Sequence, residues 1–145
     1  LSIDWLFRPK TIITADYVAK SRKAKTYTYM FTWRSPINKG SVHGNELNFC
    51  FNTLERAGNE LPQPTEQDYE LADIMSSVWA QFAKTGNPNI KELPKWKAYT
   101  AKNGEMMIFD YNCEIRNNPD RKLEEIIDRH CFKQLDEFRK KQAGK

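Results

Sequence analysis

The chain has 145 residues, 39% of them hydrophobic and 12% aromatic, and a formal net charge of +4. This composition is not that of a disordered chain, and the length allows at most one domain. The sequence contains no apolar run of the roughly 20 residues that span a bilayer. Basic clusters at 20–25 and 139–141 lack interleaved aromatic residues, which favours solvated helix ends over a nucleic-acid partner.

The first part of the chain predicts a helix followed by a strand. Pro9 can occupy the first position of a helix, where its missing N–H costs nothing, so we expect a helix over residues 10–22. Residues 26–33 alternate aromatic side chains with mostly β-branched ones, which is the clearest strand pattern in the sequence. Pro36 ends this segment.

A polar loop after the predicted strand carries one of the two histidines. His43 stands between Gly40 and Gly44, and residues 45–51 then predict a short helix or a tight apolar turn. The other histidine, His130, lies in a helical pattern near an apolar face, where packing is its expected role. His43 is therefore the best candidate for chemistry.

The strongest helix pattern covers residues 65–86 and follows a connection over residues 55–64. Thr65 can cap this helix, and Asp68 stands where the reciprocal capping acid belongs. Gly86 ends it in the expected way. One face of the helix is apolar and is expected in the core: Leu71, Ile74, Met75, Val78, Trp79 and Phe82.

The last third predicts two short extended pieces and a final helix. The extended pieces are residues 93–99 and 106–109, with a turn signal at Asn103-Gly104 between them. Asn118 opens the final helix, whose apolar face holds Leu123, Ile126, Ile127, His130 or Cys131, Leu135 and Phe138. Two amphipathic helices with one good strand are typical of the layer that covers a sheet. One convincing strand cannot hide its own edges, so the elements predict no complete sheet.

Four collinear stretches carry motifs that narrow the fold further. Residues 29–36 form a strand before the histidine loop, and residues 43–51 read H-G-N-E-L-N-F-C-F. Residues 79–89 read W-A-Q-F-A-K-T-G-N-P-N, and residues 93–110 hold L-P-K-W-K-A-Y and M-I-F-D. These stretches resemble the C-terminal part of the type B carboxylesterases, the family of para-nitrobenzyl esterases, mammalian carboxylesterases and cholinesterases, and bacterial members in particular. The resemblance implies that residues 1–145 are the C-terminal segment of an α/β-hydrolase domain. The expected fold class is therefore α/β, with one or two sheet strands plus covering helices, incomplete on its own.

The chain departs from the family pattern in ways that do not touch the chemistry. Lys97 stands where the family prefers proline, and Asn48 where bacterial members often have proline. Cys131 aligns with a cysteine that is disulfide-bonded in animal cholinesterases, but the partner position holds Arg8, so the resemblance implies no such bond here. The three cysteines lack C-x-x-C spacing, so we expect free thiols and no zinc site.

The resemblance implies ester hydrolysis by a Ser–Glu/Asp–His triad, in which the residues follow one another in that chain order. A nucleophile elbow needs G-x-S-x-G, yet the segment framed by Gly40 and Gly44 has Val42 at its centre. No glycine-rich oxyanion loop is present either. We therefore expect the serine, the acid and the oxyanion donors upstream of Leu1, with His43 as the catalytic residue that this chain supplies.

Residues near His43 have plainer expected roles. Glu46 follows the base, contrary to the chain order of the triad, and is interpreted as a structural partner for a backbone amide or a cation. Ser35 and Ser41 are expected to make loop hydrogen bonds. Two phenylalanines could either touch an acyl or alcohol group or pack in the core: Phe49 and Phe51.

The predicted function is carboxylic ester hydrolysis by a serine esterase of which this chain is the C-terminal part. The expected partners are a small neutral ester and the missing N-terminal part of the same hydrolase, and no metal or organic cofactor is needed. Alone, the chain is predicted to be inactive. Two alternatives stay open: a non-catalytic cholinesterase-like interaction domain, and an independent small binding module. The sequence indicates no compartment.

Overall fold

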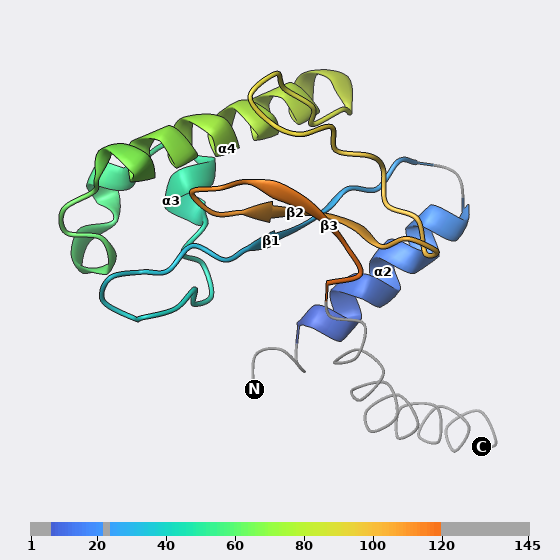
Figure 1. Cartoon of the computed structure of the whole chain (residues 1–145), viewed down its shortest axis with the longest axis horizontal. Helices are drawn as coiled ribbons and strands as arrows, with labels where there is room; N and C mark the ends of the chain where they lie inside the picture. The colour runs from blue at the N-terminus through green and yellow to red at the C-terminus, as the bar shows by residue number, and fades with distance from the viewer. Residues whose placement is uncertain (1–6, 22–23, 120–145) are drawn as a thin grey trace, which may run out of the picture.

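The computed structural model describes residues 7–21 and 24–119 of the chain. A three-stranded sheet lies in the middle, with helix α4 along one side and helix α2 on the other (Figure 1). The elements in chain order are α2 (Arg8–Ser21), β1 (Thr28–Phe31), α3 (Leu47–Cys50), the 3-10 turns η1 (Leu54–Arg56) and η2 (Gly58–Glu60), α4 (Glu66–Thr85), β2 (Glu105–Phe109) and β3 (Glu114–Asn117).

The sheet is mixed, and its central strand is buried along its whole length. β2 runs parallel to β1, with Thr28 opposite Met106, and antiparallel to β3, with Met107 opposite Ile115. All five residues of β2 are buried, as expected for a strand covered on both faces. Because side chains alternate along a strand, Met107 faces α4 and Met106 faces the opposite side.

The described residues therefore contain three strands, and the prediction of one or two was too low. β3 was missed because its sequence, Glu-Ile-Arg-Asn, has one apolar residue and no clear alternation. The predicted strand over 26–33 is shorter, since its ladder covers Thr28–Phe31. Residues 93–99 form no strand; the side chain of Asn89 instead holds this segment through both backbone groups of Trp96.

Helix α4 confirms the predicted capping and most of the predicted core face. The hydroxyl of Thr65 accepts from the backbone N–H of Asp68, and the Asp68 carboxylate accepts from the backbone N–H of Thr65. Gly86 ends the helix in the left-handed conformation, with φ of 69°. Phe82 was wrongly assigned to the core, because its side chain is 45% exposed.

The core lies between α4 and the facing side of the sheet. Its fully buried members come from the segments before and after the histidine loop, from α4 and from β2, and they include Trp33, Phe49, Leu71, Met75, Met107 and Phe109. Two of the rings, those of Trp33 and Phe49, lie 5.0 Å apart between centroids. The core therefore holds the chain on both sides of the loop that carries His43, at Trp33 before it and at Phe49 after it.

The remaining expectations for secondary structure have mixed outcomes. α2 confirms the first helix, although it begins at Arg8 and ends at Ser21. α3 confirms the short helix within residues 45–51. The final helix, with His130 and Cys131, lies outside the described residues. No helix in the described part of the chain is both long and apolar enough to cross a membrane.

Candidate functional site

His43 stands at the corner of a tight turn between β1 and α3. The backbone N–H of Asn45 donates to the carbonyl of Val42 at 3.2 Å, and Gly44 has φ of 86°. This arrangement is typical of a type II turn, in which the third residue has positive φ and is usually glycine. The turn explains why glycine follows the histidine, since a side chain at position 44 would strain the backbone.

Buried polar side chains hold the loop on which this turn sits. The Ser35 hydroxyl is buried; it accepts from the backbone N–H groups of Ile37 and Asn38 and donates to the carbonyl of Glu60. The Asn45 side chain accepts from the backbone N–H of Val42 at 2.8 Å. Ser35 thus confirms the prediction of a loop hydrogen-bonding role, whereas Ser41 is exposed and has no hydrogen bond within the described part of the chain.

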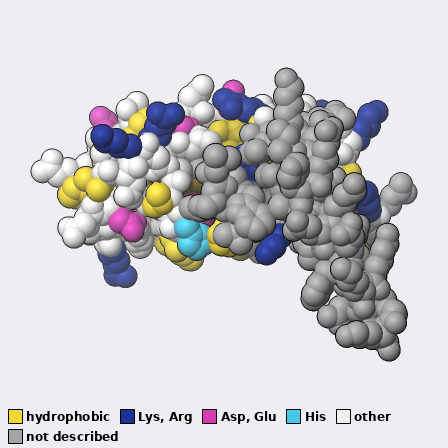
Figure 2. Space-filling model, turned by 90° about the horizontal axis from the view of Figure 1, so that it is seen from below, with side chains coloured by type: hydrophobic (Ala, Val, Ile, Leu, Met, Phe, Trp, Pro, Cys, Tyr) yellow, Lys and Arg dark blue, Asp and Glu magenta, His cyan; other side chains and the backbone are white. Residues whose placement is uncertain are grey.

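The imidazole of His43 is exposed at the rim of an open hollow. Its ring stacks on Phe7, with 5.4 Å between the centroids and 10° between the planes. Figure 2 shows a histidine side chain (cyan) at the surface beside hydrophobic side chains, and His43 is the histidine among the described residues. The ring is therefore free to meet a group that approaches from outside the described structure.

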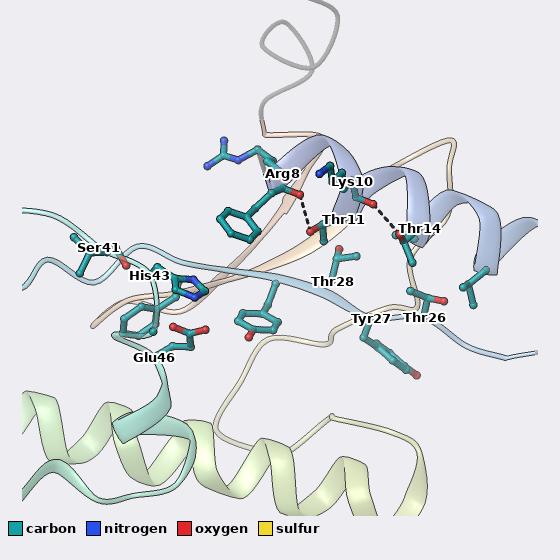
Figure 3. A pocket seen from close by; sticks show the side chains of 17 residues that line it. Arg8, Lys10, Thr11, Thr14, Thr26, Tyr27, Thr28, Ser41, His43 and Glu46 are labelled. Atoms are coloured by element: carbon teal, nitrogen blue, oxygen red, sulfur yellow. Dashed lines mark hydrogen bonds between the residues drawn. The ribbon is translucent and has the colours of Figure 1, made fainter. Parts of the chain in front are cut away.

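The hollow has a volume of about 710 Å³ and runs between α2, β1 and the histidine loop. Its lining is mixed, with threonines from α2 and β1 and the aromatic rings of Tyr27, Tyr29 and Phe31. Figure 3 shows the imidazole of His43 and the carboxylate of Glu46 directed into the same space. Proton transfer groups and apolar walls thus share one cavity, as expected for part of a site that binds an organic substrate.

Within the described part of the chain, Glu46 has no structural partner of the predicted kind. Among the described residues its carboxylate meets no backbone amide and no cation, so it faces the hollow without a hydrogen bond. Its charge acts on two neighbours. Burial, reinforced by the nearby carboxylate of Glu46, raises the pKa of Tyr29 to about 12. The same two causes raise the pKa of the Cys50 thiol to about 12, so both groups are neutral near pH 7.

The two phenylalanines after the histidine have different places. Phe49 is 1% exposed and packs in the core, so it does not line the hollow. Phe51 is 72% exposed and contributes to neither. Cys50 and Cys113 are free thiols, as predicted, and Cys131 lies outside the described residues. The described residues hold no group of three side chains that could bind a metal ion.

A buried carboxylate next to the loop was recognised from the sequence only as a helix cap. Asp68 is 1% exposed and accepts from the indole N–H of Trp33 at 2.8 Å and from the hydroxyl of Tyr111 at 2.9 Å. Burial alone raises the pKa of this carboxyl, but hydrogen bonds from Thr65, Tyr111 and Trp33 outweigh it and hold the pKa below its ordinary value. Asp68 therefore ties α4 to Trp33, which lies two residues before Ser35 at the start of the histidine loop.

Comparison with known proteins agrees with this architecture. The sequence model of the carboxylesterase family matches residues 1–126. The chain is 35% identical over 108 residues to the para-nitrobenzyl esterase of Bacillus subtilis, covering 70% of this chain and 21% of that protein. It is 31% identical over 118 residues to the bile salt-activated lipase of Rattus norvegicus, covering 74% of this chain and 18% of that protein.

Solved structures give the same result. An esterase from the anaerobe Clostridium hathewayi that can hydrolyse aliphatic aromatic polyesters superposes with a TM-score of 0.77 and 27% identity, covering 86% of this chain and 25% of that one. The carboxylesterase Est55 of Geobacillus stearothermophilus superposes with a TM-score of 0.66 and 29% identity, covering 79% and 24%. The chain thus spans about a fifth to a quarter of the relatives it matches. Its architecture is a partial α/β-hydrolase fold, and the chain belongs to the carboxylesterase family.

Proposed function

We propose that this chain forms the C-terminal part of a serine esterase and supplies the general base of its triad through His43. The observation that carries the proposal is the placement of the imidazole: it stands on a turn after a sheet strand, at the rim of a hollow. In the triad mechanism the histidine takes the proton of the attacking serine and returns it to the leaving alkoxide. Such a base must reach groups held by other segments, and the exposed ring of His43 meets that need.

The chemistry of the hollow supports a neutral ester as the substrate class. Aromatic and threonine side chains form much of the lining, together with Arg8, Lys10 and Glu46, and the Tyr29 phenol within it stays uncharged near pH 7. An uncharged acyl or alcohol group would lose little hydration on entering such a space. The mechanism needs no metal ion, because the serine, the imidazole and the acid carry out both proton transfers.

The free edge of β1 supports the missing N-terminal part of the same hydrolase as the partner. β1 pairs with β2 on one side only within the described structure, and the hollow extends along its other edge. Natural edge strands are usually blunted by lysine, proline or a bulge, but Thr28–Phe31 contains neither lysine nor proline. Phe7 and Tyr29 border this edge with 53% and 38% exposure. A further strand is therefore the occupant that fits.

The test is substitution of His43 in the complete protein that contains this chain. We expect His43→Gln to lower kcat for para-nitrophenyl esters by at least about 10⁴-fold, since loss of the base disables the whole triad. His130→Gln is the matched control, because it removes the other histidine, and it should leave kcat within about twofold. Full activity of His43→Gln would refute the proposal, and wild-type protein that binds a partner but hydrolyses no ester would favour the interaction domain.

The isolated 145-residue chain provides a second arm. It contains His43 without an elbow serine, so we expect no ester turnover above buffer. Addition of the separately produced N-terminal part should restore turnover if the two parts dock along β1. Ester turnover by the chain alone, abolished by His43→Gln, would show that the nucleophile lies within these 145 residues. It would refute the proposal that the serine comes from another part of the protein.

A further inference from the structure

We propose that Asn45 and Glu60 form a positioning pair that holds the His43 turn in its productive orientation. This inference rests on the proposed role of His43 as general base. It concerns two residues to which the sequence analysis assigned no role, one on the turn itself and one on η2, 15 residues later in the chain.

Asn45 closes the turn around His43 with its side chain. The amide oxygen accepts from the backbone N–H of Val42 at 2.8 Å, while the backbone N–H of Asn45 donates to the carbonyl of Val42 at 3.2 Å. These two hydrogen bonds span the His43-Gly44 corner in opposite directions. Asn45 is 4% exposed, so water cannot easily replace the side-chain hydrogen bond.

Glu60 fixes the other end of the Asn45 amide. The amide nitrogen of Asn45 donates to the carboxylate of Glu60 at 3.2 Å, and this hydrogen bond sets which way the amide is turned. The carbonyl of Glu60 also accepts from the hydroxyl of Ser35 at 3.3 Å. Ser35 and Asn45 stand at the two ends of the histidine loop, so both ends are anchored on one residue of η2.

Apolar burial does not hold the tip of this loop. Its two large apolar side chains, Ile37 and Val42, are 57% and 39% exposed. The orientation of the turn therefore depends on the polar anchors, and their loss would let the turn move while the core beneath stays packed. Because a displacement of about 1 Å at a reacting group can cost on the order of 100-fold in rate, the expected damage is to kcat.

The experiment measures kcat and KM of the complete esterase with four variants. Glu60→Ala removes the acceptor and should lower kcat about tenfold, with KM within about twofold. Glu60→Gln keeps an oxygen that can accept from Asn45, and it should retain kcat within about twofold. Asn45→Ala removes both side-chain hydrogen bonds and should lower kcat by more than Glu60→Ala. The matched control is Glu55→Ala, an exposed glutamate on the same connection, which should behave as wild type.

Two further readouts separate positioning from a general loss of stability. The double variant Asn45→Ala/Glu60→Ala should be no worse than Asn45→Ala alone, because both changes break the same contact. Hydrogen exchange of a peptide covering residues 36–46, measured by mass spectrometry, should speed up in Glu60→Ala and Asn45→Ala but not in Glu55→Ala. Peptides from α4 should keep their exchange rates in all variants.

The outcomes distinguish this inference from the proposed function. If His43→Gln abolishes hydrolysis but Glu60→Ala and Asn45→Ala keep wild-type kcat, the positioning pair is refuted and the general base stands. If Glu60→Gln loses as much activity as Glu60→Ala, the acceptor role is refuted. If His43→Gln remains active, the proposed function fails, and unchanged exchange of residues 36–46 would then refute the anchoring as well.

Discussion

Replacement of Asp68 by alanine should destabilise the chain by about 3–4 kcal/mol. The carboxylate accepts four hydrogen bonds, from the N–H and hydroxyl of Thr65 at 2.8 and 2.7 Å, from Trp33 at 2.8 Å and from Tyr111 at 2.9 Å. A hydrogen bond to a charged group contributes about 1.5–3 kcal/mol, and a helix cap about 1 kcal/mol. The expected loss is smaller than the sum of these contributions, because two donors find other partners in the variant. The indole N–H of Trp33 still donates to the Tyr111 hydroxyl at 3.1 Å, and Thr65 can hydrogen-bond to water.

Asp68→Asn removes the charge of the carboxylate but keeps the shape of the side chain. The asparagine oxygen can still accept from Trp33 and Tyr111, but its NH₂ group replaces the oxygen that accepts from both the N–H and the hydroxyl of Thr65. The hydrogen bond from the N–H is lost, whereas the hydroxyl can rotate to accept from the new NH₂ group. We expect a cost of about 1–2 kcal/mol. Because the folded pKa of Asp68 lies below its unfolded value, the carboxylate stabilises the fold above the unfolded pKa of about 3.9, and this stability is lost as pH falls through the folded pKa. The difference between wild type and Asp68→Asn should therefore shrink below about pH 4.

Urea denaturation followed by tryptophan fluorescence, at pH 7 and pH 3, tests these values. Asp73→Ala on the same helix is the matched control. Its exposed carboxylate accepts a single hydrogen bond within the described structure, from the side-chain amide of Asn52, and its loss should cost under about 0.5 kcal/mol. A cost below about 1 kcal/mol for Asp68→Ala at pH 7 would show that the buried network contributes little. A wild-type–Asn gap that widens toward pH 3 would contradict the sign of the pKa shift.

Two other predictions concern a backbone turn and a thiol. Gly104→Ala should lower the free energy of unfolding by about 3 kcal/mol in urea denaturation, because φ is 59° and a Cβ would lie 1.6 Å from the side-chain oxygen of Asn118. Gly58→Ala is the control: φ is 58° but no atom lies within 4 Å of the added Cβ, so the loss should be only about 1 kcal/mol. Equal losses for the two variants would refute the clash with Asn118. Cys50, whose pKa is raised to about 12, should react with iodoacetamide at pH 8 roughly a thousandfold more slowly in the folded chain than in urea, because the thiolate is the reactive form. Glu46→Gln should speed the reaction of the folded chain, and peptide mapping measures both rates. Rapid labelling of Cys50 in the folded state would contradict its burial.

Local patterns in the sequence predicted those parts of the fold that depend on neighbouring residues. The capping of α4 by Thr65 and Asp68 follows from spacing alone, and so does the left-handed end at Gly86. The hydrogen bond that Asp68 accepts from Trp33 could not be predicted in this way, because Trp33 lies 35 residues away in the chain and no local pattern links the two. The same holds for β3, whose four residues form a strand only because β2 offers them an edge.

The candidate site divides in the same way. The His43-Gly44 pair was recognisable as a motif, and the structure explains it as the corner of a type II turn. The hydrogen bond from Asn45 to Glu60 could not be foreseen, since an asparagine and an exposed glutamate 15 residues apart carry no signal of contact. For Glu46 the described residues supply no backbone amide or cation as a partner, so its structural role stays a prediction.

The parallel pairing of β1 with β2 bears on how the protein is made by the ribosome. The hydroxyl of Thr28 donates to the carbonyl of Glu105, 77 residues further along, so α4 and the histidine loop are synthesised before β1 has its neighbour. At about 5–20 residues per second this interval lasts roughly 4–15 seconds. During translation the edge of β1 that pairs with β2 must therefore stay without its partner strand for this interval.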